Sequence, residues 1–551
     1  MTEIDCIDFG PDGVGGYPTF EVAAFTGEPV VRLVYATHPD GLGEKGDFWH
    51  ETRATYLGED VILPILPASD NRFDTFQITR TGTYSAPLQQ GLVRYAKVFL
   101  ETPGASVKIA NLRFENRGTH SEEQPVGSFT CSDGRLDAIW KAGVRTCQLA
   151  AIPARRQSLA VRDGNATKIL GPSHAYLSDG AKRDRLVWSG DLWWADLNMY
   201  YAFAPDSPYM PGSIRMLAEN QTPEGYVQAC PYPESHGPLK SGDYGPFQSD
   251  EFAAWLIPVA YNYHLHTGDD KLMAEILPAL ERLADYLLAH CREDGIFEQR
   301  PETSKNAGAL RFGAESTHHR SYMNVLLLGC LNRMAELSPK NSVRYAAAAK
   351  KLRAVLADNF AAPGGGLVKS LEDPVLDQEG TALWHALCPA DAGPYPAALR
   401  KRIWHAKFQA VAIRALFESG LADEAVAAIY EHNWAKILDP AWQGLRTTYE
   451  CMYLNTREWG DEAHPDTSIS GLLSRHLLGV APTAPGYAHF VFRPPRATSV
   501  THAAGRVPTP HGFIDAAWRI ENGKCKADVS VPEGTVCTLL LPDSPPREIH
   551  G

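Results

Sequence analysis

The chain has 551 residues, of which 44% are hydrophobic and 10% aromatic, and its formal net charge is −13. This length and apolar content predict a folded globular protein with more than one domain and exclude a fibrous or disordered chain. Recognition of phosphates depends on Lys and Arg, so the excess of acidic residues opposes nucleic-acid binding. The sequence shows no apolar run of about 18 residues and no leader-like start, so we expect no membrane span and a cytoplasmic protein.

The first part of the chain has the composition of β-strands. Residues 17–117 are rich in Val, Thr, Phe and Gly, and Val107–Ala110 alternates as a half-buried strand does. A turn is expected at Thr102-Pro-Gly104. We therefore predict an N-terminal β-sandwich over residues 1–125 that ends in a polar, aperiodic linker.

From residue 126 the apolar period becomes that of helices. Ser132-Asp133 predicts the N-cap of a first helix, and Thr267-Gly-Asp269 precedes a long amphipathic one. Further helices are expected at 321–336, 341–358, 403–418 and 421–437. Many antiparallel helices joined by long loops are typical of an (α/α)6 toroid rather than a four-helix bundle, so we predict a toroid over residues 126–480.

Strands return near the end of the chain. Cys525–Val531 alternates between polar and apolar residues, and Pro532-Glu-Gly534 predicts a turn into a strand that begins at Val536. We predict a small C-terminal β-sandwich over residues 481–551. The expected fold class is thus mainly α with β, a toroid flanked by two sandwiches.

The densest polar cluster of the sequence spans residues 178–191 and contains the acids Asp179, Asp184 and Asp191. At about 100° per residue these acids point to different faces of one helix, so they converge only if the segment is a loop. The aromatic-rich stretch Leu192–Tyr201 is expected to be the helix that follows. Acids beside Arg and Trp suit a sugar, because carboxylates bond hydroxyls or transfer protons while an aromatic face covers the apolar side of the ring. On composition alone, a surface loop held by Asp–Arg pairs is an equal alternative.

A second polar cluster spans Trp442–Glu450 and is followed by Arg457–His464. Taken alone it favours a structural role, since acids near Trp are common. His318-His319 and His264-x-His266 have no third ligand at a characteristic spacing, and the ten Cys are scattered, so we expect no metal and no cofactor. The sequence also has no phosphate loop, nucleophile elbow or H-E-x-x-H motif.

The first polar cluster resembles the signature loop of the α-L-rhamnosidases of glycoside hydrolase family 78, which belong to the six-hairpin glycosidases. That loop has an Asp, an Arg before the catalytic acid, and Trp-x-Gly before a last Asp. The matching residues are Asp179, Arg183, Asp184, Trp188, Gly190 and Asp191. Weaker similarity at Phe129–Trp140, Thr267–Asp269, Ala463-His464, Leu478-Gly479 and Pro485–Tyr487 extends the likeness to roughly residues 90–495.

The resemblance implies an inverting glycoside hydrolase that releases terminal L-rhamnose from α-L-rhamnosides, with a carbohydrate or glycoside as its partner. It implies Asp184 as general acid and Glu450 as general base, with Glu458 as the alternative base. The substrate-binding residues that it implies are Asp179, Arg183, Trp188, Asp191, Trp193, Trp194, Asp250 and His464. The sequence does not indicate an oligomeric state.

Two positions depart from the family pattern. The general acid of the family is usually Glu, whereas Asp184 is one methylene shorter. Thr447-Thr-Tyr-Glu450 lacks the Trp that usually precedes the base and one residue of the usual spacing. Three alternatives therefore stay open: another six-hairpin activity, acting on a different α-linked sugar or as a uronate lyase, a carbohydrate-binding protein without catalysis, and a structural or adaptor protein. A product that absorbs ultraviolet light would identify the lyase, and binding without turnover would identify the second.

Overall fold

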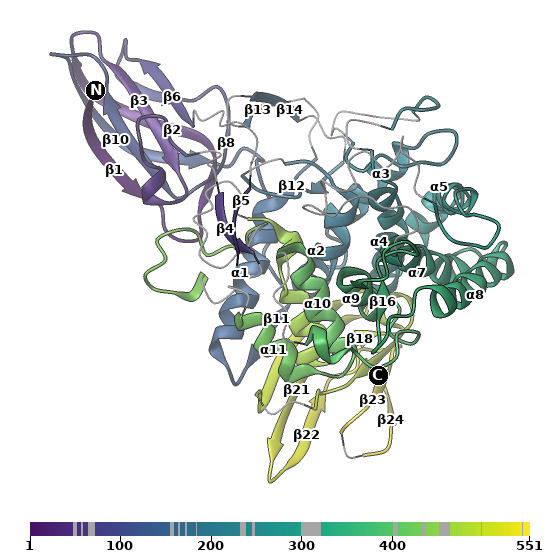
Figure 1. The fold of residues 1–551 in the computed structure, drawn as a ribbon. Coiled ribbons are helices and arrows are strands. Elements are labelled where there is room, and N and C mark those ends of the chain that lie inside the picture. The colour runs from purple at the N-terminus through teal and green to yellow at the C-terminus, as the bar shows by residue number, and fades with distance from the viewer. Residues whose placement is uncertain are drawn as a thin grey trace.

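The computed structural model places strands at both ends of the molecule and helices between them (Figure 1). It describes residues 1–47, 52–56, 59–63, 72–154, 159–163, 166–170, 174–182, 185–231, 239–244, 248–298, 321–400, 406–431, 437–450, 463–496, 499–542 and 544–551. Three parts are distinguished below: the N-terminal β-region, the helical region and the C-terminal β-region.

The N-terminal β-region contains two antiparallel sheets. One has the order β1 (Thr2–Asp8), β9 (Tyr95–Leu100), β3 (Val30–Ala36) and β6 (Phe73–Gln77). The other has the order β10 (Ser106–Glu115), β2 (Val14–Thr26) and β7 (Gly82–Ser85), and β8 (Gln90–Val93) also pairs with β2. Side chains from both sheets, among them Phe20, Leu33 and Val98, share one buried core. A hairpin of β4 (Thr52–Tyr56) and β5 (Glu59–Leu63) is also present.

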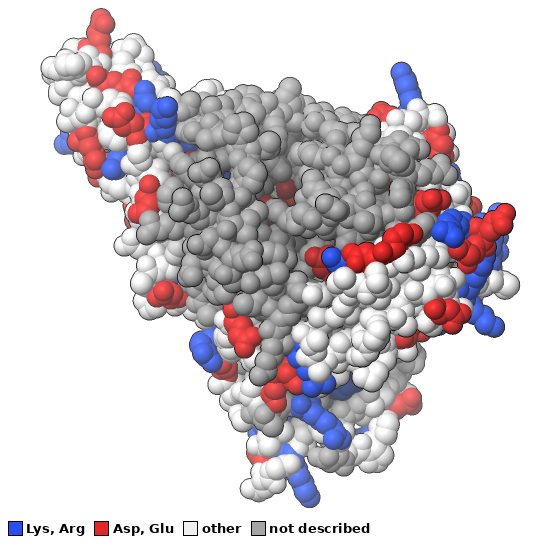
Figure 2. All heavy atoms as spheres, viewed as in Figure 1, with Lys and Arg blue, Asp and Glu red and all other residues white. Residues whose placement is uncertain are grey.

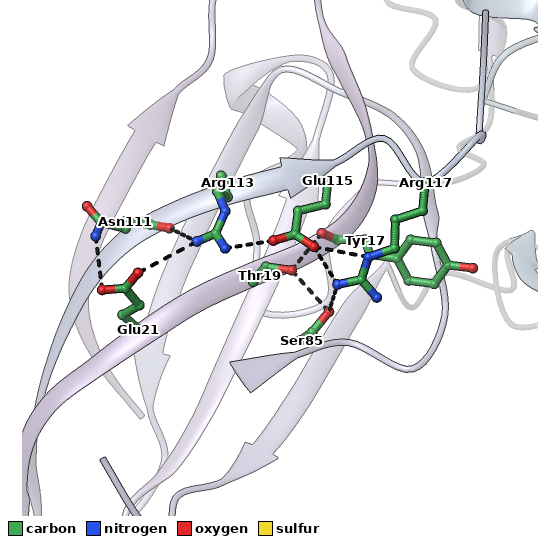
Figure 3. Close-up of polar contacts among 8 residues, drawn as sticks. All are labelled: Tyr17, Thr19, Glu21, Ser85, Asn111, Arg113, Glu115 and Arg117. Atoms are coloured by element: carbon green, nitrogen blue, oxygen red, sulfur yellow. Dashed lines mark hydrogen bonds and ion pairs between the residues drawn. The ribbon is translucent and has the colours of Figure 1, made fainter. Parts of the chain in front are cut away.

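The sheet of β10, β2 and β7 carries an exposed polar network (Figure 3). Arg113 donates to Glu115 at 2.6 Å and lies 4.0 Å from Glu21. The guanidinium of Arg117, which also pairs with Glu115, lies 4.9 Å from the centre of the Tyr17 ring. Exposed pairs of this kind contribute little to stability, so this surface offers sites for neutral control substitutions.

The helical region contains α1 (Gly134–Ala150), α2 (Ser189–Ala202), α3 (Tyr209–Glu219), α4 (Asp250–Thr267), α5 (Asp270–Ala289), α7 (Ser321–Leu337), α8 (Ser342–Asn359), α9 (Gln378–Leu387), α10 (Ala406–Glu418), α11 (Ala422–Glu431) and α12 (Ser470–Leu472). Helices α2, α4, α7, α9 and α10 contact one another in this order. Every residue of α2 is buried, whereas α5 and α8 bury one face against their neighbours and expose the other. The region is thus built from inner helices that outer helices cover.

Local sequence signals predicted these helices well. Asp133 caps α1 by accepting from the N–H of Arg135, and Asp269 caps α5 by accepting from that of Leu272. The segments expected at 321–336 and 341–358 are α7 and α8, and α10 ends before Gly420, whose φ is 75°. The helix expected at 421–437 is α11 as far as Glu431, beyond which 432–436 lie outside the described residues.

The C-terminal β-region also has two sheets. One has the order β11 (Ser128–Cys131), β20 (His502–Thr509), β21 (Gly512–Glu521) and β22 (Lys524–Val529). The other has the order β18 (Val480–Pro482), β19 (His489–Phe492), β23 (Val536–Leu539) and β24 (Arg547–His550). The turn at Pro532–Gly534 therefore carries the chain from one sheet to the other. Strand β11, which precedes the helices, pairs with β20, which follows them.

The surface carries charges of both signs. On the face shown in Figure 2, acidic and basic side chains are interspersed over the described residues, and basic ones are frequent near α8. Within the described part of the chain, no helix is both long and apolar enough to cross a membrane.

Asp196 lies inside the helical region, in the middle of α2, and its side chain is fully buried. The amide of Asn262 on α4 donates to its carboxylate at 2.8 Å. Burial raises the pKa of Asp196 to about 7, against the opposing effect of this hydrogen bond and of the nearby guanidinium of Arg414. The folded protein therefore holds a proton on Asp196 at a pH where the unfolded chain has lost it.

We expect Asp196→Asn to change how stability depends on pH. Because the pKa is raised on folding, the wild-type free energy of unfolding should fall as pH rises from the unfolded pKa near 4 towards 7. An amide does not titrate, so the variant should gain stability relative to the wild type between pH 4.5 and pH 8. Urea unfolding at both values measures this, and parallel profiles would contradict the assignment.

Candidate active site

The predicted signature loop connects β15 (Tyr176–Leu177) to α2. Asp179 closes it: its N–H donates to the carbonyl of Leu186 at 2.9 Å, and its carboxylate accepts from the N–H groups of Leu186 at 3.1 Å and Gly180 at 2.9 Å. Arg185 has a φ of 65° and donates to the carbonyl of Ala181 at 2.9 Å. Hydrogen bonds within the loop therefore hold its described parts in place. The predicted residues Arg183 and Asp184 lie outside the described residues.

The loop ends in the first turn of α2, which begins at Ser189 rather than at the expected Leu192. The N–H of Ser189 donates to the carbonyl of Ala229 at 3.2 Å, which anchors the helix start. Asp191 consequently lies in the first turn, 4% exposed, where the helix dipole favours a negative charge. Gly190 is required there, because a Cβ would come within 2.9 Å of the Phe252 ring.

The three candidate tryptophans of this segment are buried. Trp188 meets the edge of Phe252 with ring centres 5.6 Å apart, and Trp194 packs against the same ring at 6.3 Å. Trp193 stacks on Trp255 at 4.5 Å, and the guanidinium of Arg414 lies 4.7 Å from its ring centre. The observed contacts of Trp193 are thus with the interior of the helical region.

The candidate base segment lies next to this loop. Ala181 donates its N–H to the carbonyl of Ala463 at 3.1 Å, and the next residue, His464, donates its N–H to the carbonyl of Thr448 at 3.1 Å. The hydroxyl of Thr448 returns a hydrogen bond to the carbonyl of His464 at 2.7 Å. These bonds bring together segments that are about 270 residues apart in the sequence. Glu450, two residues after Thr448, is partly exposed, whereas Glu458 lies outside the described residues.

His464 lies at the start of a short turn, Pro465–Thr467, packed on α2. Its side chain is 1% exposed, and its Nδ1 lies 4.0 Å from the carboxylate of Asp466, which is fully buried. Asn198 of α2 donates to the carbonyl of Pro465 at 3.1 Å, and the hydroxyl of Thr467 donates to the backbone carbonyl of Tyr449 at 2.6 Å. The structure thus adds Asp466, which the sequence reasoning missed although it follows the candidate His464 by two positions.

Asp250 lies at a neighbouring helix start. It is buried in the first turn of α4, after the N-cap Ser249, and the hydroxyl of Tyr286 donates to its carboxylate at 2.9 Å. The hydroxyl of Ser189 at the start of α2 donates to the carbonyl of Phe252 in α4. The first turns of α2 and α4, with Asp191 and Asp250, are therefore adjacent. Glu251, also buried, was not predicted.

The histidines considered as metal ligands have other contacts. His264 pairs with Asp270 at 2.9 Å, and the ring of His266 bonds the carbonyl of Asn262 at 2.8 Å and stacks on Tyr200. Burial lowers the pKa of His266 to about 3, so it is neutral. His318 and His319 fall outside the described ranges, and within those ranges no three His, Cys, Asp or Glu side chains form a metal-binding group.

Sequence comparison finds relatives of one kind. Residues 479–551 match the family model of the bacterial α-L-rhamnosidase C-terminal domain. An α-L-rhamnosidase of Streptomyces avermitilis is 23% identical over 410 residues, which are 67% of this chain and 36% of that protein. One of Alteromonas sp. is 27% identical over 130 residues, 21% of this chain and 14% of that protein. The chain therefore spans well under half the length of these relatives.

Solved structures share the fold. The family-78 rhamnosidase of Bacillus sp. GL1 has a TM-score of 0.68 at 17% identity and covers 98% of this chain and 53% of its own. A rhamnosidase from Klebsiella oxytoca, solved with rhamnose bound, has a TM-score of 0.65 at 18% identity and covers 86% of this chain and 88% of its own. The chain is thus similar in sequence to α-L-rhamnosidases over 410 residues, and it shares its fold with solved rhamnosidases, one of them of glycoside hydrolase family 78.

Proposed function

We propose that this chain is a glycoside hydrolase that releases terminal L-rhamnose from α-L-rhamnosides. One observation carries the proposal: hydrogen bonds from Ala181 to Ala463 and from His464 to Thr448 join the signature loop to the segment that ends at Glu450. A single displacement at a sugar requires an acid and a base on opposite sides of the scissile bond, and these two segments would supply one each. The named activity of the sequence relatives supports rhamnose as the sugar.

In the proposed reaction Asp184 donates a proton to the glycosidic oxygen as its bond to the anomeric carbon breaks. Glu450 removes a proton from a water molecule that attacks this carbon from the opposite face. The water oxygen ends on the sugar and the aglycone leaves as an alcohol. The configuration of the anomeric carbon is therefore inverted.

The remaining candidates are proposed as contacts to the sugar. Buried carboxylates at the starts of α2 and α4, Asp191 and Asp250, suit the recognition of hydroxyls, as does His464 beside the base segment. Trp188 and Trp194 are proposed to supply apolar surface for the 6-methyl group, whereas Trp193 stacks on Trp255. Asp179 shapes the loop, and Arg183 is proposed to keep a neighbouring carboxylate ionised.

The proposal also includes the type of each domain and the boundaries between the domains. The inner and outer helices support an (α/α)6 toroid, and the paired sheets at each end support two β-sandwiches. The proposed domains are residues 1–125, 126–480 and 481–551. The family match that begins at residue 479 supports the last boundary.

The configuration of the released sugar tests the mechanism. We expect the first-formed rhamnose to have the anomeric configuration opposite to that of the substrate, because inverting enzymes hold their carboxyl groups about 6.5–9.5 Å apart and admit a water between them. Proton NMR before mutarotation measures this on an aryl α-L-rhamnoside. Retained configuration or a trapped glycosyl-enzyme would contradict the roles given to Asp184 and Glu450.

A further inference from the structure

A fully buried lysine connects the signature loop to the N-terminal β-region. Lys182 lies two residues before Asp184, and its ammonium is 3.2 Å from the carboxylate of Asp47 and 3.1 Å from the hydroxyl of Thr37. Arg72 approaches the other carboxylate oxygen of Asp47 at 3.1 Å. The side chains of Lys182 and Asp47 are both 0% exposed. A charged bridge therefore crosses between the loop and the β-region without contact with solvent.

The N-terminal end of this bridge is held rigidly. The carboxylate of Asp47 accepts from the N–H of Thr37 at 2.6 Å and from its hydroxyl at 2.8 Å. The N–H of Asp47 donates to the carbonyl of Tyr35 in β3 at 3.1 Å, and Arg72 also donates to the carbonyl of Leu92. Although burial alone would raise the pKa of Asp47, the charges of Lys182 and Arg72 hold it below its usual value. Asp47 is thus an ionised, fixed anchor.

The backbone of the loop packs tightly on the same β-region. A Cβ on Gly91 of β8 would lie 2.8 Å from the carbonyl oxygens of both Ala181 and Lys182, so only glycine admits this approach. Leu92 of β8 joins Ala181, Leu445 and Ala463 in one small buried cluster. The loop and the segments before Glu450 and His464 therefore rest on a common support.

Apolar packing alone could hold the loop, so the buried charge calls for an explanation. Removing an ammonium and a carboxylate from water is costly, and a buried ion pair is seldom a net source of stability. Such a pair does fix the position of the groups that it joins, and catalytic groups must be held to within about 0.5 Å. The exchange of a pair for an apolar contact would keep the fold but loosen the loop.

We propose that Lys182 is a positioning residue, which through Asp47 makes the N-terminal β-region a rigid support for the loop of the general acid. The β-region then serves the reaction itself and is not a separate attached module. This inference rests on the proposed function, because it assumes that Asp184 donates the proton.

The test compares Lys182→Met and Thr37→Val with the wild-type chain on two substrates, 4-nitrophenyl α-L-rhamnoside and methyl α-L-rhamnoside. Methionine removes the charge but leaves Asp47 paired with Arg72, so the variant should fold. We expect kcat on the methyl glycoside to fall by about tenfold or more, with a smaller loss on the nitrophenyl glycoside and little change in KM. Thr37→Val should act in the same direction more weakly, and Lys182→Arg should restore part of the loss.

Arg32→Met is the matched control, since it breaks a half-buried pair with Glu101 in the same β-region. It should leave both rates within about twofold of the wild type. If Lys182→Met lowers both rates equally or not at all, the positioning role is wrong while the proposed function stands. If Lys182→Met does not fold, Thr37→Val decides: a ratio of kcat on the methyl glycoside to kcat on the nitrophenyl glycoside that equals the wild-type ratio would contradict the positioning role of Lys182. A wild-type chain inert on both substrates would overturn the proposed function and this inference with it.

Discussion

Replacing Asp184 by Asn is expected to abolish most activity on rhamnosides with poor leaving groups. General acid catalysis supplies a factor of about 10²–10⁴, and an alkoxide cannot depart without a proton. A 4-nitrophenolate needs little protonation, so kcat/KM on the nitrophenyl glycoside should fall much less. Measuring kcat/KM over a series of aryl and alkyl α-L-rhamnosides gives a leaving-group dependence that is steeper in Asp184→Asn than in the wild type.

Two further variants sharpen this test. Asp184→Glu restores the residue that the family usually carries and should keep a shallow leaving-group dependence, because a carboxylic acid is still present. Glu115→Gln changes only the exposed network of Figure 3 and should match the wild type on every substrate. An equal loss on all substrates in Asp184→Asn would show that Asp184 is not the proton donor.

The sequence predicted those features of the fold that depend on neighbouring residues. Helix starts at Asp133 and Asp269 follow from side chains that bond nearby N–H groups, and the end of α10 follows from a glycine with positive φ at 420. Helix α2 begins at Ser189, three residues before the predicted start at Leu192. Its anchor is a hydrogen bond from Ser189 to Ala229, which no local pattern reveals.

The sequence did not predict which strands from distant segments pair with one another. Strand β22 and the strand beginning at Val536 are adjacent in sequence and were expected to follow a simple turn, yet they lie in different sheets. Strand β11 pairs with β20 across the entire helical region. Pairing of this kind is decided by tertiary packing, since period-two alternation shows that a strand exists but not which partner it takes.

In the candidate site, too, the features within one segment were predicted from the sequence, whereas the contacts between distant segments were not. Residue spacing predicted the signature loop, because Asp179, Trp188 and Asp191 follow one another within a short segment. The partners that hold the loop come from elsewhere in the chain: Ala463 binds Ala181, and Asp47 lies 135 positions before Lys182. In the sequence, Lys182 has no feature that distinguishes it from the other polar residues of this loop. Only the burial of its charge shows that it joins two parts of the molecule.

Replacing Glu450 by Ala should affect all substrates alike, in contrast to Asp184→Asn. Activation of the attacking water is common to every leaving group, so kcat should fall by about 10²–10⁴ without a change in the leaving-group dependence. Glu450→Gln, which keeps the shape of the side chain, should behave in the same way, because an amide cannot accept the proton. Stopped assays on the nitrophenyl and methyl glycosides measure both variants.

Glu458→Ala tests whether the alternative residue Glu458 is the general base. Glu450 is the base that the family resemblance implies. The hydrogen bonds from Ala181 to Ala463 and between His464 and Thr448 connect its segment to the signature loop and support this choice. We therefore expect Glu458→Ala to retain substantial activity. If Glu450→Ala is fully active while Glu458→Ala is inert, the base is Glu458. The contact at Thr448 would then only support the site, because a general base must reach the water whose proton it removes.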